Sequence, residues 1–127
     1  MRGLLDTHTF IWWDSTPSKL SAAALSFLQN RANTILLSVA SVWEMVIKIQ
    51  LGKLTLPAPL TTILTQQQAN GLQILAVALA HVLALENLPT HPKDPFDRLL
   101  VTQTNLEADV ILSADPVFVR YGVKVLW

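Results

Sequence analysis

The sequence predicts an α/β fold, in which a short and mainly parallel sheet is covered by helices on both faces. Short apolar runs that are typical of strands alternate with longer runs of helical periodicity. The candidate strands are almost entirely apolar, as in sheets that are buried on both sides. The chain has 127 residues, of which 51% are hydrophobic and 14% are charged. This is enough to bury the core of one compact domain, and we expect a single domain over residues 1–127.

Five segments have strand character. They lie at about residues 2–5, 34–37, 72–75, 110–112 and 123–126. Between the strands, two stripes of apolar residues at helical spacing predict helices that pack on the sheet. The first stripe contains Leu20, Ala24, Phe27 and Leu28, and the second contains Val42, Met45, Val46 and Ile49.

Three further helices are indicated by their start and stop signals. One covers residues 59–70 and is stopped by Gly71, and another covers residues 78–87 before a proline. The last begins in "KDPFDRLL" and runs to about Glu107, because Asp94 suits the N-cap and Pro95 the first helical position. Its inward face is expected to carry Phe96, Leu99, Leu100 and either Gln103 or Leu106.

Composition excludes several classes of function. Nine basic and nine acidic residues leave no net charge, so affinity for nucleic acid would depend on local features. The absence of cysteine excludes disulfides and thiolate zinc sites, and a cytoplasmic location is the default expectation. The amino terminus does not resemble a signal peptide, because Asp6 interrupts its apolar part. The longest apolar region, residues 72–88, is too interrupted to span a membrane.

Four acidic residues follow the expected strands or begin the expected helices. Asp6 closes the first strand and Asp115 follows the fourth, while Glu44 and Asp97 lie in the first turns of two helices. Crossover connections in a parallel sheet bring strand ends and helix starts to one edge, where open α/β sheets bind their ligands. The four carboxyl groups should therefore meet at one edge of the sheet.

Carboxylates that are crowded into a cleft repel one another. At about 4 Å, two like charges cost on the order of 1 kcal/mol in water and about 4 kcal/mol at an effective dielectric constant of 20. A raised pKa or a bound divalent cation relieves this repulsion. Mg²⁺ and Mn²⁺ prefer oxygen ligands and can activate water against a phosphodiester. The acids therefore indicate metal-assisted phosphoester hydrolysis.

Each acid also has a structural interpretation. Ser41 and Glu44 fit a capping box, and Glu44 stands four residues before Lys48, as in a helix ion pair. Asp94 and Arg98 have the same spacing, and Asp97 would favour the positive end of its helix dipole. Asp115 precedes a proline, as capping residues do. Asp6 has no such explanation, and the combination of four acids favours a metal site.

Other catalytic motifs are missing from the sequence. It contains no G-x-S-x-G, P-loop or G-x-G-x-x-G pattern, and its three histidines lack zinc-type spacing. His81 lies in an apolar helical segment and is best read as a core or boundary residue, whereas His8 and His91 could flank the acidic site. The four tryptophans are better explained by core packing than by base stacking, although Trp12 and Trp13 could anchor a protein interface.

Four segments together resemble the PIN-domain family, and in particular the VapC-type toxins of bacterial toxin–antitoxin pairs. They are "LLDTHTFIWW", "SVASVWEMVIKIQLGKLTLP", "LPTHPKDPFDRLLVTQT" and "ILSADPVFVRYGVKVLW", which cover nearly the whole chain in order. The resemblance implies a doubly wound three-layer α/β/α sandwich and a Mg²⁺- or Mn²⁺-dependent endoribonuclease. It also implies a small VapB-type antitoxin as inhibitor and a homodimer.

The resemblance also assigns roles to residues. The four family acids match Asp6, Glu44, Asp97 and Asp115, and Thr7 and Ser113 match the small polar residues beside two of them. Asp6 and Asp97 are expected to be the firmest metal ligands, with Asp115 completing the set and Glu44 binding directly or through water. A metal-activated water would attack an RNA phosphodiester and leave a 5′-phosphate and a 3′-hydroxyl.

Basic residues near the acids are candidates for phosphate contacts, which position a strand without reading its sequence. They are Lys48, Lys53, Lys93 and Arg98, with His91 as a further candidate. Asp94 is an additional acid that we leave outside the metal site.

Four other functions are considered. A non-enzymatic RNA- or protein-binding module on the same fold would keep its binding when the acids are removed. A phosphoacceptor receiver domain would need paired acids after the first strand, and a D-x-D phosphatase would need an aspartate where "DTH" has histidine. A PIN nuclease outside toxin–antitoxin systems is the fourth.

Overall fold

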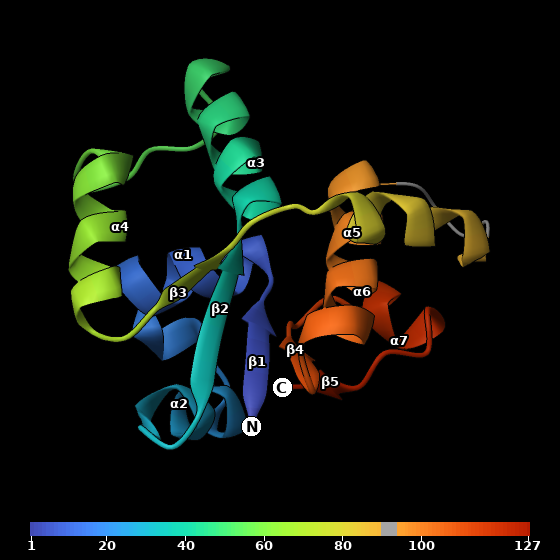
Figure 1. Ribbon diagram of the computed structural model, residues 1–127. Coiled ribbons are helices and arrows are strands. Elements are labelled where there is room, and N and C mark those ends of the chain that lie inside the picture. Colours follow the sequence, from blue (N-terminus) through green and yellow to red (C-terminus); the bar gives the residue numbers. More distant parts are fainter. Residues whose placement is uncertain (90–93) are drawn as a thin grey trace.

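The computed structural model describes residues 1–89 and 94–127. A five-stranded sheet occupies its centre, with the strand order β3-β2-β1-β4-β5 and every pairing parallel (Figure 1). The strands are β1 (Arg2–Leu5), β2 (Thr34–Ser38), β3 (Gln73–Leu75), β4 (Val110–Leu112) and β5 (Val125–Leu126). The predicted segments 2–5 and 110–112 are confirmed to the residue, and the predicted α/β sheet with helices on both faces is confirmed as well.

Seven α-helices and two 3₁₀ turns connect the strands within the described residues. The helices are α1 (Thr7–Ser15), α2 (Ala22–Gln29), α3 (Val39–Gln50), α4 (Leu60–Ala69), α5 (Leu79–Leu83), α6 (Pro95–Glu107) and α7 (Val117–Arg120). The 3₁₀ turns are η1 (Pro17–Lys19) and η2 (Ala84–Asn87).

The two faces of the sheet carry separate hydrophobic clusters. Because strand side chains alternate, Leu5 and Leu37 point to the cluster under α1, α2 and α4, whereas Leu4 and Leu36 point to the cluster under α6 and α7. Figure 1 shows the same division, with the blue and green helices on one side of the sheet and the orange and red helices on the other. The three-layer α/β/α arrangement is therefore confirmed.

Gly3 sits at the closest approach between the sheet and the helix layer. A Cβ atom at this position would lie 2.6 Å from Phe27 Cε1 and 2.7 Å from Leu112 Cδ1. The strand therefore requires glycine here for lack of space.

Several expected elements differ from the structure. The helix α1 was not predicted, because its apolar residues do not fall on one face. The predicted helix over residues 78–87 is a short α5 followed by η2, and the strand at 123–126 contains only its last two residues. On α3, Val46 and Ile49 are exposed rather than packed on the sheet, since the helix rises beyond the sheet edge (Figure 1).

The entry of α6 is as predicted. The Asp94 carboxylate accepts hydrogen bonds from the amides of Phe96 and Asp97, and Pro95 occupies the first turn. On the inward face Gln103 is buried, whereas Leu106 is 53% exposed, which decides between the two alternatives for that position.

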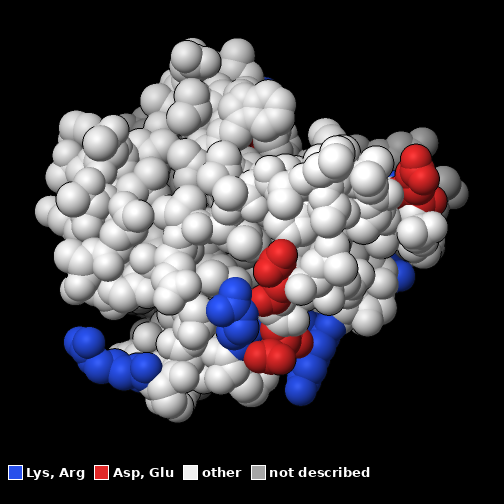
Figure 2. Space-filling view, viewed as in Figure 1, with Lys and Arg blue, Asp and Glu red and all other residues white. Residues whose placement is uncertain are grey.

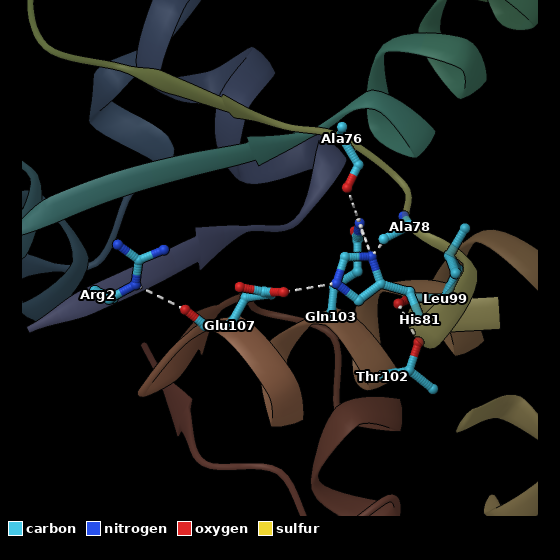
Figure 3. Close-up of polar contacts among 8 residues, drawn as sticks. All are labelled: Arg2, Ala76, Ala78, His81, Leu99, Thr102, Gln103 and Glu107. Carbon is cyan, nitrogen blue, oxygen red and sulfur yellow. Dashed lines mark hydrogen bonds and ion pairs between the residues drawn. The ribbon is translucent and has the colours of Figure 1, made fainter. Parts of the chain in front are cut away.

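A buried polar cluster joins α5 to α6 (Figure 3). His81 is 2% exposed, and its Nδ1 accepts a hydrogen bond from the Ala78 amide at 2.9 Å. The ring therefore carries its proton on Nε2, which donates to Glu107 Oε1 at 3.0 Å. Gln103 Nε2 contacts the same Nδ1 and the Ala76 carbonyl, both at 3.3 Å. His81 is thus a satisfied core residue, as predicted.

None of the helices in the described ranges is long and apolar enough to cross a membrane.

Candidate metal-dependent active site

The four predicted acids come from four different connections of the sheet. Asp6 follows β1 directly, and Asp115 lies three residues after β4. Glu44 belongs to α3, which leaves β2, and Asp97 belongs to the first turn of α6, which leads into β4. Parallel strands place all these connections at the carboxyl edge of the sheet, as the sequence predicted.

Asp6 is held in the floor of this edge. Its backbone occupies the N-cap position of α1, but its side chain makes no capping hydrogen bond. The carboxyl group is instead buried, and its Oδ2 accepts a hydrogen bond from the Ser113 hydroxyl at 2.8 Å. Burial raises the pKa of Asp6 above 3.8, against the opposing effects of the Ser113 hydroxyl and of His8. Asp6 therefore has no capping role that would account for its burial.

Thr7 and Lys48 orient the Glu44 carboxylate. The Thr7 hydroxyl donates to Glu44 Oε1 at 2.7 Å, and Lys48 Nζ lies 3.1 Å from Glu44 Oε2. The predicted ion pair between Glu44 and Lys48 is confirmed. Each oxygen of this carboxylate therefore has a partner on a different element, one on α1 and one on α3.

The capping box predicted for Glu44 is wrong. The N-cap of α3 is Ser38, whose hydroxyl accepts from the Ala40 amide, and the first turn contains no acid. Glu44 consequently lies in the second turn, and Ser41 is buried, with no hydrogen-bond partner for its hydroxyl among residues 1–89 and 94–127. The helix starts earlier than the sequence pattern indicated, because the chain turns directly from β2 into α3. The capping explanation for Glu44 is thereby removed.

The pKa of Asp97 is raised by burial and by the charges of the other acids. Burial raises the pKa of Asp97 from 3.8 to about 7, and negative charges on four neighbours add to the rise. These neighbours, in order of decreasing effect, are Asp94, Asp6, Asp115 and Glu44. The charges of the three other predicted acids therefore all act on Asp97 in the same direction, which is to favour its protonated form.

Asp115 is exposed and has a local structural role as well. Its Oδ1 accepts from the Val117 amide at 3.0 Å, and its own amide donates to Ser113 Oγ at 3.0 Å. The Ser113 hydroxyl therefore links the loop that carries Asp115 to the Asp6 carboxylate. The predicted cap-then-proline pattern is wrong, because the N-cap of α7 (Val117–Arg120) is Pro116, although Asp115 does bind the first amide of that helix. The second oxygen of Asp115 has no hydrogen-bond partner among the described residues.

The site has the oxygen donors that Mg²⁺ and Mn²⁺ prefer, and its uncompensated negative charge suits a cation. Within residues 1–89 and 94–127, however, no three acidic or histidine side chains are already arranged to share one metal ion. Mg²⁺ usually keeps several waters and takes only one or two carboxylates directly. The residues therefore fit a cation that is held partly through water, and the structure does not preform a closed cage.

The predicted phosphate contacts have different surroundings. Lys48 is paired with Glu44, and Arg98 donates from Nη1 to the Pro89 carbonyl at 2.9 Å. The ion pair predicted between Asp94 and Arg98 is wrong, because the Arg98 guanidinium donates instead to the backbone carbonyls of Pro89 and Leu85. Lys53 makes no salt bridge to the described residues. His91 and Lys93 lie outside the described residues.

Charge is sparse elsewhere on the visible surface. Figure 2 shows a face that is mostly uncharged, with its acidic and basic side chains in small groups.

An aromatic pair stands beside the acids. Phe96, which precedes Asp97, forms an edge-to-face pair with Trp43 at a centroid distance of 5.3 Å. The sequence analysis assigned no substrate-contacting role to Phe96. The expected core position of Trp43 is wrong, because its side chain is 61% exposed. On α3 and on α6, an aromatic residue directly precedes a predicted acid, as Trp43 precedes Glu44 and Phe96 precedes Asp97. This pattern in the sequence could have marked both aromatic residues as neighbours of the site.

Comparison with known proteins places this geometry in a family. The family model of the PIN domain matches residues 3–124. The fold is similar to a chain of VapBC2 from Rickettsia felis bound to a DNA fragment from its promoter, and to one of DNA-bound VapBC from Salmonella typhimurium. Both have a TM-score of 0.70, at 13% and 15% identity, over 98% of this chain and 97% and 96% of theirs. No curated protein matches the sequence. The family match spans nearly the whole chain, and the chain therefore belongs to the PIN-domain family.

Proposed function

We propose that this protein is a Mg²⁺- or Mn²⁺-dependent endoribonuclease of the VapC toxin type. The observation that carries the proposal is the acidic edge of the sheet, where burial raises the pKa of Asp97 to about 7 and the negative charges of Asp94 and of the three other predicted acids add to the rise. A structural role does not require this arrangement. Carboxylates that are crowded together repel one another, and a bound cation would offset this repulsion. Family membership supports a nuclease, and the similarity of fold to VapBC proteins supports the toxin type.

The acidic and hydroxyl side chains at this edge would have different roles in holding the cation. Asp6 and Asp97 would hold the cation, and Asp115 and Glu44 would bind it directly or through water. A bound Mg²⁺ or Mn²⁺ would neutralise charge on the phosphodiester and lower the pKa of a water. The Ser113 hydroxyl fixes the rotation of the Asp6 carboxyl, and Thr7 fixes one oxygen of Glu44. No side-chain nucleophile is needed.

The test is cleavage of single-stranded RNA by the wild type and by Asp6→Asn, each with Mg²⁺, with Mn²⁺ and with a chelator. We expect cleavage by the wild type only with a metal ion, and a loss of about a hundredfold or more in the variant, in the range found when single groups that stabilise a transition state are removed. Glu86→Gln is the matched control, since Glu86 is exposed on η2 and is not among the charges that raise the pKa of Asp97.

The alternative functions predict other results. A binding module would retain RNA or protein binding in Asp6→Asn and would show no metal-dependent cleavage in the wild type. Cleavage of structured DNA in preference to RNA would indicate a PIN nuclease outside toxin–antitoxin systems. Cleavage that is independent of metal would contradict the proposed mechanism.

We further propose a small VapB-type antitoxin as partner, a homodimer and a cytoplasmic location. Exposed apolar side chains on α5, Leu79 at 73% and Leu83 at 55%, support association with a second copy. The neighbouring reading frame should encode a short protein with a DNA-binding start and an amphipathic tail. Co-expression should then relieve growth inhibition by the wild type, and light scattering should give the mass of a dimer for the isolated protein.

A further inference from the structure

Two clefts open beside the acidic edge, and each is partly lined by the acids themselves. The first, of about 320 Å³, is lined by Asp6 and Asp115 together with His8 and Trp12, and we call it the Trp12 cleft. The second, of about 400 Å³, is lined by Glu44 and Asp94 together with an apolar wall, and we call it the Phe96 cleft. Both volumes fall within the range of about 300–1,000 Å³ that is common for small-molecule sites.

Aromatic and cationic side chains accompany both clefts. In the Trp12 cleft, the His8 and Trp12 ring centroids are 6.0 Å apart, and Lys19 Nζ lies 5.9 Å from the Trp12 ring. The rings of Trp12 and Trp127 are 5.8 Å apart, so the carboxyl-terminal residue supports this wall. Each cleft therefore combines an apolar surface with a positive charge near its rim.

The Phe96 cleft has the same chemistry built from other elements. Ile47 on α3 and Leu51, the C-cap residue of that helix, line this cleft together with Phe96 on α6, and Lys48 and Lys53 line the same space. Lys48 is engaged by Glu44, whereas Lys53 is exposed and forms no salt bridge within the described ranges. The Asp94 carboxylate, which also lines the cleft, is occupied by the amides at the start of α6.

We propose that these two clefts hold the nucleobases on either side of the cleaved phosphate, so that a single-stranded RNA crosses the acidic edge from one cleft to the other. The inference rests on the proposed function and adds the path of its substrate. Because the chain has no net charge, its phosphate contacts depend on a few local cations, whereas base stacking on aromatic side chains contributes affinity without net charge. A duplex would hide the base faces, and the substrate is therefore unpaired at the cleaved bond.

The first experiment measures binding rather than cleavage. A fluorescent single-stranded RNA of about eight nucleotides is titrated with protein in Ca²⁺, which takes the same oxygen ligands as Mg²⁺, and the RNA is checked for integrity afterwards. Trp12→Leu and Phe96→Leu should each weaken binding about fivefold or more. The matched control is Trp13→Leu, because Trp13 neighbours Trp12 on α1 but lines a different hollow. Its affinity should stay within about twofold of the wild type, since it removes no stacking surface from either cleft.

Loss of folding is separated from loss of binding in two ways. Thermal unfolding is measured for every variant, and Lys53→Gln, which changes only an exposed side chain, should also weaken binding and reduce its salt dependence. Equal affinity in all variants, equal weakening by Trp13→Leu, or equally tight binding of a duplex of the same length would overturn the proposal.

The second experiment places one abasic nucleotide on either side of the mapped cleavage site. In the wild type, each abasic substitution should reduce kcat/KM about fivefold or more. In Phe96→Leu, one of the two substitutions should have no further effect, and in Trp12→Leu the other should have none. If the wild type cleaves no RNA, the proposed nuclease function fails, and the binding experiment still decides the proposal for the clefts.

Discussion

Replacement of Asp97 by asparagine should stabilise the metal-free protein, although it removes a predicted metal ligand. The pKa of Asp97 rises from 3.8 to about 7 in the folded state, so the folded protein binds its proton more tightly than the unfolded chain does. Below about pH 4 both states are protonated, and the group has no effect on stability. As the pH rises towards 7, the unfolded chain ionises first and the free energy of unfolding falls. Above about pH 7 the full penalty is present, and asparagine removes it.

The magnitude follows from the size of the shift. A change of about three pKa units corresponds to about 4 kcal/mol if no charge is screened. The Asp97 carboxyl is only half-buried, and solvent screening reduces the figure to about 1–2 kcal/mol. The free energy of unfolding of Asp97→Asn should therefore exceed that of the wild type by about 1–2 kcal/mol near pH 8, and most of this difference should be lost near pH 5.

Urea unfolding, followed by tryptophan fluorescence, tests the predicted stabilisation of Asp97→Asn at about pH 5 and about pH 8 in the presence of a chelator. Glu86→Gln is the control for removal of an exposed carboxylate. Saturating Mg²⁺ should then stabilise the wild type more than the variant, since a ligand that binds only the folded state adds to its stability. A stabilisation that is equal at both pH values, or a loss of stability near pH 8, would refute the electrostatic reasoning.

Three further changes test other parts of the structure. Gly3→Ala should lower the free energy of unfolding by about 1–3 kcal/mol in urea melts, because the new methyl group meets the Phe27 ring; an unchanged stability would mean that the helix layer can move away. Thr7→Val should reduce metal-dependent cleavage by about tenfold without a comparable loss of stability, since it frees one Glu44 oxygen, and Thr7→Ser should restore most of the rate. His81→Phe should destabilise by about 1–3 kcal/mol in thermal melts while the cleavage rate of the folded protein stays unchanged; a selective loss of rate would contradict its structural role.

Local chemistry was enough to predict much of this fold. Apolar runs located the strands at residues 2–5 and 110–112, since a strand that is buried on both faces carries apolar side chains at most of its positions. The Asp94-Pro95 pair located the start of α6, because capping depends only on neighbouring residues. The grouping of acids at one sheet edge also followed from the order of elements, since parallel connections return each helix start to the same side.

Other features depended on contacts between distant residues. The start of α3 at Val39 depends on how β2 pairs in the sheet, and this displaced Glu44 from the first turn into the second. The burial of Gln103 in place of Leu106 depends on the packing of α5 against α6, where His81 supplies a polar partner. The exposure of Trp43 results from the rise of α3 beyond the sheet, which no local pattern records.

The sequence by itself determined the elements and the residue types of the acidic site, because these depend on short-range propensities and on the parallel topology. Only the tertiary structure decided the strand order, the hydrogen-bond partners of Asp6 and Glu44, and the pKa of Asp97. Burial and electrostatic coupling act through space over a few ångströms, between residues that stand far apart along the chain.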